Sequence, residues 1–129
     1  VSLQRVWNAP DSVAALEEWA RHLARAHPRI LPVARAVDHA RRTDPDAARM
    51  HDEIMGRWRK GSRRLAEWLE REGRLSDHWT VETAADTIWV LMSWDVLEGL
   101  LVERRWSRRR YADHMALLLR STFVKHHQA

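Results

Sequence analysis

The sequence predicts an all-α protein, built as a five-helix bundle. Apolar residues recur at helical spacing through most of the chain, and no segment alternates apolar and polar residues as a strand would. Four Gly and four Pro among 129 residues leave little material for turns. We therefore expect a few long helices joined by short loops, and a chain of this length has room for one core.

The composition narrows the class of protein further. Hydrophobic residues make up 45% and charged residues 31% of the chain, which is typical of a folded domain. The absence of cysteine excludes disulfides, zinc fingers and thiol catalysis. Acidic residues are interleaved with the basic ones, so the net charge of +4 is weak support for nucleic-acid contact. No apolar run approaches the roughly 20 residues that cross a bilayer, so no membrane partner is expected.

Prolines set the expected boundaries of the first two helices. The first is predicted from Asp11 or Ser12 to about residue 27, with Ser12 as a plausible N-cap. Pro28 ends or bends it. The second is predicted over about residues 29–42, with Pro32 in its first turn, the place where a helix tolerates proline.

The third helix has the clearest start and stop signals. Asp44 is a good N-cap, Pro45 a good first helical residue, and Gly73 a good residue to follow the end at about Glu72. One face of this helix carries a stripe of apolar residues, and Arg and Glu lie opposite. This pattern is typical of an outer helix of a globular domain.

The most informative stretch is residues 80–124, which predicts two helices that are apolar nearly all the way round. Thr80 is expected to cap the first, which kinks near Ser93 and continues to about residue 105. Ser107 is expected to cap the second, which runs to about Lys125. A surface helix needs only one apolar stripe. Helices without a free polar face indicate packing on both sides, and a second copy of the chain is the simplest partner.

Signals for catalysis or metal binding are sparse. The chain contains no HExxH, no GxSxG, no glycine-rich phosphate loop and no Glu-x-x-His pair, and its eight histidines are scattered. We expect neither an enzyme nor a bound metal or cofactor. His27 and His51 fall on apolar arcs, where each is either a polar group in a pocket or a core histidine bonded to a backbone carbonyl. Trp19, Trp58 and Trp89 either line a cavity between helices or fill the core.

The end of the chain resembles a known family. The motif residues are Ala84, Ala85, Asp86, Trp89, Leu91 and Ser93, then Leu100, Leu101, Val102, Glu103 and Arg104, then Trp106, Ser107 and Tyr111. They look like the C-terminal effector-binding and dimerisation domain of TetR-family transcriptional regulators. The resemblance covers about residues 10–124. Two positions depart from the family pattern, which usually has Gly where Arg105 stands and often has Pro where Trp94 stands.

The resemblance implies a division of the chain. Residues 1–10 would be the end of a helix that links residues 11–129 to a DNA-reading helix-turn-helix, which this chain does not carry. DNA would therefore be a partner only through that other domain. The parent protein would be a bacterial repressor in the cytoplasm, and effector binding would relieve its hold on DNA.

The resemblance also implies two sites. A small apolar or aromatic effector would bind among the first four helices, and the last two helices would form a four-helix interface in a homodimer. The candidate effector-binding residues are Trp19, Leu23, His27, His51, Ile54, Trp58, Trp89 and Met92. The candidate dimer residues are Tyr111, His114, Leu118 and Thr122. The alternative hypothesis is a stand-alone helical dimeric interaction module with no ligand.

Overall fold

The computed structural model describes residues 3–126, so residues 1–2 and 127–129, at the outer ends of the two predicted regions, lie outside it. The described elements are, in order, α1 (Gln4–Trp7), α2 (Ser12–Ala40), α3 (Pro45–Arg71), α4 (Val81–Leu91), α5 (Trp94–Glu98), the π-helical turn η1 (Gly99–Glu103) and α6 (Arg108–Phe123). Across residues 3–126 the only strand-like pairing is an isolated antiparallel bridge between Leu75 and Val124. The all-α prediction is confirmed. No helix within this range is long and apolar enough to cross a membrane.

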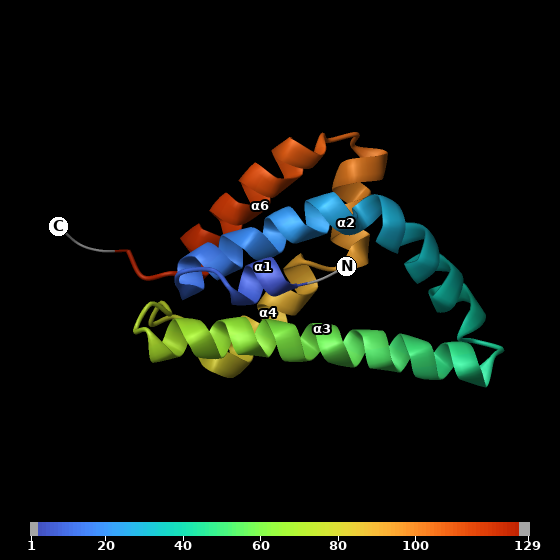
Figure 1. The fold of residues 1–129 in the computed structure, drawn as a ribbon, viewed down its shortest axis with the longest axis horizontal. Coiled ribbons are helices and arrows are strands. Elements are labelled where there is room, and N and C mark those ends of the chain that lie inside the picture. Colours follow the sequence, from blue (N-terminus) through green and yellow to red (C-terminus); the bar gives the residue numbers. More distant parts are fainter. Residues whose placement is uncertain (1–2, 127–129) are drawn as a thin grey trace.

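The prediction of two separate helices before residue 43 is wrong, because α2 is one helix of 29 residues that contains both Pro28 and Pro32. Pro28 has no N–H to donate to the carbonyl of Ala24, four residues earlier. The ring of His27 replaces that donor, with Nδ1 3.0 Å from the Ala24 oxygen. The helix therefore changes direction along its length instead of ending (Figure 1).

The start of α2 is fixed by Asp11 and not by Ser12. The Asp11 carboxylate accepts a hydrogen bond of 2.8 Å from the backbone N–H of Ala14, which makes it the N-cap. Ser12 is the first helical residue, and its N–H donates to the carboxylate of Glu72 at 2.8 Å. That bond ties the start of α2 to the end of α3.

The other predicted caps are confirmed. Asp44, Ser93 and Ser107 accept hydrogen bonds from backbone N–H groups in the first turns of α3, α5 and α6. Thr80 forms a reciprocal capping box with Thr83 at the start of α4. Each such cap is worth about 1 kcal/mol. The kink at Ser93 is real, whereas α6 ends at Phe123, two residues before the predicted end.

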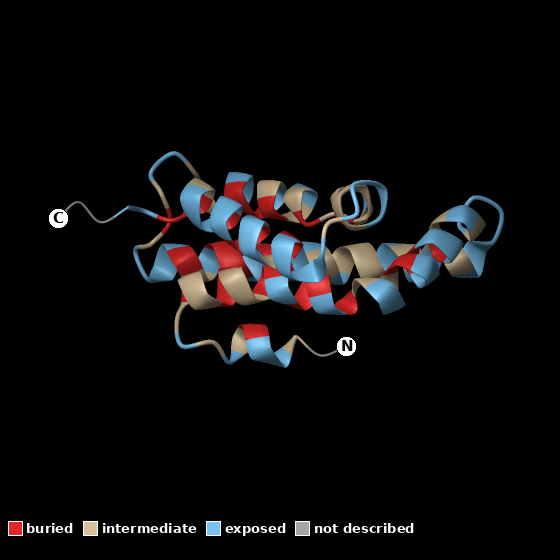
Figure 2. Ribbon diagram, turned by 90° about the horizontal axis from the view of Figure 1, so that it is seen from above, coloured by how far each residue is buried: buried red, intermediate tan, exposed pale blue. Residues whose placement is uncertain are grey.

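The helices form layers around α2. Figure 1 shows α2 between α6 on one side and α3 on the other, and α4 packs mainly on α3. Buried residues lie on the helix faces that meet one another (Figure 2). The short α1 packs on α2 through Val6, which is fully buried, and through the ring of Trp7. The two apolar helices of residues 80–124 therefore rest on different neighbours, α4 on α3 and α6 on α2.

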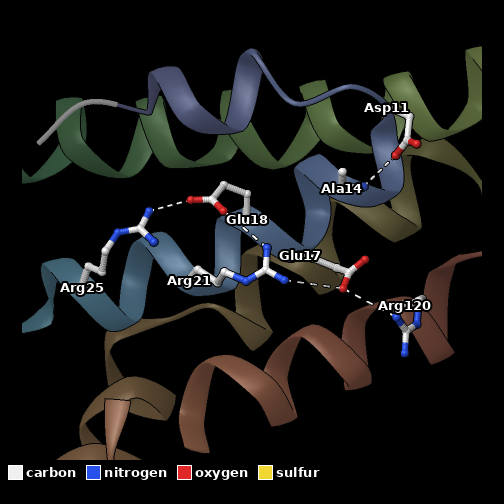
Figure 3. Close-up of polar contacts among 7 residues, drawn as sticks. All are labelled: Asp11, Ala14, Glu17, Glu18, Arg21, Arg25 and Arg120. Carbon is white, nitrogen blue, oxygen red and sulfur yellow. Dashed lines mark hydrogen bonds and ion pairs between the residues drawn. The ribbon is translucent and has the colours of Figure 1, made fainter. Parts of the chain in front are cut away.

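Charged residues link α2 to α6 along the polar face of α2 (Figure 3). Glu17 lies 3.9 Å from Arg21 of its own helix and 3.5 Å from Arg120 of α6. Glu18 lies 3.4 Å from Arg21 and 2.6 Å from Arg25. Burial raises the pKa of Glu18, but the hydrogen bonds and charges of Arg25 and Arg21 outweigh this and leave the pKa below its usual value.

Candidate ligand-binding site

A cavity of about 600 Å³ lies between α2 and α3. The half of α2 that follows Pro28 supplies part of its wall, and beyond the bend this half runs back towards the start of α3 (Figure 1). The rest comes from the first half of α2, from α3, from Leu3 and from Trp94. The full lining consists of Leu3, Trp19, His22, Leu23, Arg29, Ile30, Val33, Ala34, Ile54, Arg57, Trp58 and Trp94.

A second cavity of about 180 Å³ adjoins the first. The two share Ala34, Trp58 and Trp94 as lining residues. The rings of Trp58 and Trp94 lie 5.5 Å apart between centroids, and the ring of Trp89 lies 6.4 Å from that of Trp58. The remaining lining is Leu31, Arg35, Asp38, His51, Met55, Trp89, Ser93 and Asp95. The aromatic rings of Trp58 and Trp94 thus form a wall common to both cavities.

The two cavities differ in charge. Two carboxylates, Asp38 and Asp95, line the smaller cavity, and Arg35 beside them is paired with Glu98. The hydrogen bond of 2.8 Å from Arg41 lowers the pKa of Asp38, so this carboxyl group is ionised at neutral pH. The charged residues of the larger cavity are Arg29 and Arg57. Burial, with the nearby charge of Arg25, lowers the pKa of His22, which is therefore neutral at pH 7.

Several indole N–H groups near the cavities lack an acceptor. The Nε1 atoms of Trp19, Trp58 and Trp89 are buried and have no hydrogen-bond partner within residues 3–126. A buried donor without an acceptor is unfavourable by about 1–3 kcal/mol. All three residues line a cavity. The nitrogen atoms themselves are inaccessible to solvent, so the cavities are lined by other atoms of these rings.

Most of the predicted effector-binding residues come together at these cavities. Trp19, Leu23, Ile54 and Trp58 line the larger one, and His51, Trp58 and Trp89 line the smaller one. Two residues do not. Met92 is fully buried in the core, and His27 is held by its bond to the Ala24 carbonyl. For His27 the structure therefore matches the structural alternative, a histidine bonded to a backbone carbonyl.

Sequence reasoning missed the residues that the bend in α2 contributes. Arg29, Ile30, Val33 and Ala34 follow Pro28 directly, and all four line the larger cavity. Periodicity predicts which side of a helix faces the core, but it does not predict where a bend places one half of a helix relative to its neighbour. The two prolines within seven residues of these positions were the available signal. Trp94 was missed because it directly follows the interruption of the helix at Ser93.

The outer face of α6 is only partly as predicted. His114 and Leu118 are exposed, and Thr122 is half-buried with its hydroxyl donating to the Leu118 carbonyl at 2.6 Å. Tyr111 is fully buried inside the chain, so its assignment to the dimer face is wrong. Burial also raises the pKa of its phenol group. Tyr111 lies next to Met115 on the helix surface, which places it at the edge of the core-facing arc.

Metal ligands do not converge in the described part of the chain: no group of three or more His, Asp or Glu side chains there is placed to hold an ion. In the comparisons with known proteins, no protein-family model, no curated protein and no solved structure matches this chain.

Proposed function

We propose that this chain binds a small apolar or aromatic molecule in the larger cavity. We propose further that it is the effector-sensing and dimerisation domain of a TetR-like transcriptional repressor. The observation that carries the first proposal is the cavity of about 600 Å³ between α2 and α3, with tryptophan and aliphatic walls. Sites for small molecules typically have volumes of about 300–1,000 Å³, apolar walls and a few polar groups.

Two backbone features support the resemblance to the TetR family. Arg105 has a φ of 57°, in the left-handed region that glycine adopts without strain, and the family usually has Gly at this position. Trp94 is the first residue of α5 and follows the N-cap Ser93, the position that favours proline. The family often has Pro there. The two departures in sequence thus lie at positions whose backbone suits the residues of the family.

The cavity is placed to influence the N-terminal segment. Leu3 lines the larger cavity directly, and Trp19 lines it while contacting Trp7 of α1 at 6.0 Å between ring centroids. The guanidinium of Arg64 on α3 lies 4.0 Å from the centroid of the Trp7 ring. A ligand that moves Trp19 would change how α1 packs against α2. We propose that this motion biases two arrangements of an attached DNA-reading domain, in the cytoplasm of a bacterium.

A homodimer is the second part of the proposal. Four of the six large apolar side chains that are exposed in the described chain lie within residues 80–124, namely Val90, Val102, Leu117 and Leu118. Leu117 and Leu118 lie on α6, 51% and 43% exposed. Exposed apolar residues concentrated on one segment favour an interaction surface. A second copy of the chain would cover them.

The binding proposal is tested with tryptophan fluorescence. Purified protein is titrated with a library of small hydrophobic compounds, and saturable changes in emission are expected because three indoles line the larger cavity. Ala34→Leu is the blocking variant, since Ala34 lines both cavities. Ala116→Leu is the control, because Ala116 is similarly buried but lines neither cavity. Thermal unfolding verifies that both variants remain folded.

The outcomes separate the two functions considered. Binding that is lost in Ala34→Leu and kept in a folded Ala116→Leu supports a ligand site. A dimer that binds no compound in the library supports the stand-alone interaction module instead.

The dimer is tested by sedimentation at micromolar concentration. The wild-type chain is expected to sediment as a dimer, and Leu118→Glu as a monomer, because an unpaired charge buried at an interface is costly. Ser121→Glu, exposed on the same helix, is the control for the added charge. A monomeric wild-type chain at this concentration would overturn the dimer proposal.

A further inference from the structure

The polar side chains that line the larger cavity have one property in common: all of them can donate hydrogen bonds. They are the guanidinium groups of Arg29 and Arg57, the imidazole of His22 and the indole of Trp94. None of the lining residues assigned to this cavity is Asp, Glu, Asn, Gln, Ser, Thr or Tyr. Apart from the second nitrogen of His22, no side chain here offers an acceptor to a ligand.

The two arginines at the cavity are not neutralised by the protein. Arg29 comes from α2 and Arg57 from α3, so positive charge flanks the cavity from both helices. Neither residue takes part in an ion pair or a ring contact anywhere in residues 3–126. Other arginines of the same helices are paired, for example Arg25 with Glu18 and Arg63 with Glu67. The positive charge at the cavity is therefore available to a ligand.

The indoles of Trp19 and Trp58 contribute apolar surface and not hydrogen-bond donors. Their Nε1 atoms are buried and inaccessible to solvent, although both residues line the larger cavity. A ligand therefore meets carbon atoms of these rings, which suit an apolar body. The charged donors of the cavity are Arg29 and Arg57, and an amine would add a further positive charge beside them.

We propose that the ligand is an amphipathic organic anion, with a carboxylate group between Arg29 and Arg57 and an apolar body among Trp19, Ile30 and Trp58. This inference rests on the proposed function, because it names the chemical class that the cavity binds. Guanidinium groups pair with carboxylates through parallel hydrogen bonds, which makes arginine well suited to this role. The smaller cavity, with Asp38 and Asp95, repels the anionic group, so the carboxylate stays at the arginine side.

The test uses two series of compounds in which only the polar group changes. The first series is decanoate, decan-1-ol and decylammonium, and the second is 2-naphthoate, 2-naphthol and 2-naphthylmethylammonium. Affinities are measured by isothermal titration calorimetry. We expect each carboxylate to bind at least tenfold more tightly than the alcohol or phenol of its series, and the ammonium compound to bind most weakly. Raising the salt concentration from 50 to 500 mM should weaken only the carboxylate.

Two double variants test whether Arg29 and Arg57 supply the positive charge that binds the carboxylate. In Arg29→Gln/Arg57→Gln the carboxylate should lose its advantage, while the affinity for the neutral compound stays within twofold. Arg42→Gln/Arg71→Gln is the matched control, because Arg42, in the turn after α2, and Arg71, at the end of α3, are both exposed and line neither cavity. The control should keep the full preference for the carboxylate.

The outcomes distinguish this inference from the function on which it rests. If none of the compounds binds, both proposals fall. If the alcohols bind as tightly as the carboxylates, or if the control variant loses the preference as completely as the cavity variant, the cavity is a ligand site but the anionic class is wrong.

Discussion

Gly61 of α3 and Trp19 of α2 are packed so closely that a Cβ atom on Gly61 would lie 2.6 Å from Cη2 of Trp19. The ring of Trp19 also contacts Trp7 of α1, with 6.0 Å between ring centroids. A glycine in the middle of α3 is therefore required by the neighbouring ring and not by the local backbone. This contact sets the distance between the two helices that enclose the larger cavity.

Gly61→Ala is expected to destabilise the chain by about 1–2 kcal/mol, since the ring of Trp19 must shift from its present contacts with α3 and Trp7. Gly56→Ala is the matched control on the same helix, with nothing within 4 Å of the added Cβ. Helix propensity alone should stabilise this control by about 0.5–1 kcal/mol. The measurement is chemical unfolding of both variants. Equal stabilisation by the two substitutions would show that Trp19 does not press on Gly61.

Arg105→Gly is expected to stabilise the chain by about 0.5–1 kcal/mol. Arg105 has a left-handed backbone conformation, which is costly for a residue with a Cβ, and glycine removes this cost at some loss of chain entropy. The residue is exposed, so few contacts are lost. Arg104→Gly is the control, because Arg104 is also exposed but has a negative φ. This substitution should destabilise the chain, since glycine loses more conformational freedom on folding. Thermal unfolding of both variants checks the prediction, which a destabilised Arg105→Gly would contradict.

His27 and Pro28 are expected to be energetically coupled. His27→Ala should destabilise the wild-type chain by about 1 kcal/mol, because the Ala24 carbonyl then loses its donor. In a Pro28→Ala background the backbone N–H of residue 28 can bond that carbonyl, and the same substitution should have a much smaller effect. A double-mutant cycle of unfolding free energies measures the difference. Additive effects would mean that His27 does not replace the missing donor.

The stability of the chain is expected to depend on the protonation of His22. Burial lowers the pKa of His22 in the folded chain, while unfolding restores its usual value of about 6.5. The unfolded chain therefore binds more protons as the pH falls below about 6.5, and stability falls with it. Urea unfolding from pH 7.5 to pH 5 should show a steeper loss for the wild type than for His22→Gln. Parallel curves would contradict this role for His22.

Helix starts were the most predictable part of the fold, because each depends on a short local pattern. Asp44 before Pro45, and Thr80, Ser93 and Ser107, all accept backbone N–H groups where expected. The continuity of α2 was not predictable in the same way. Whether a proline ends a helix depends on whether the freed carbonyl finds another donor, and here His27 supplies one.

Only the residues of the candidate site that face the interior of the bundle could be predicted from the sequence. Trp19, Ile54 and Trp58 follow from periodicity alone, because a cavity between α2 and α3 must use their inward faces. Arg29 and Arg57 are exposed, so periodicity assigns them to solvent. Tyr111 shows the same limit of periodicity. It lies at the edge of the face of α6 that packs on the core, and a small rotation of the helix decides whether such a residue is buried or exposed.

The most direct test of the ligand cavity is a nitrogen-15 NMR titration of the tryptophan indole groups. Single Trp→Phe variants assign the signals, and decanoate, 2-naphthoate and decan-1-ol are then added separately. Binding in the larger cavity predicts saturable shifts for Trp19, Trp58 and Trp94. The indole signals of Trp68 and Trp79, which line neither of the two cavities, should not shift. Unchanged signals from Trp19, Trp58 and Trp94 with all three compounds, or equal shifts of all indoles, would contradict a ligand site between α2 and α3.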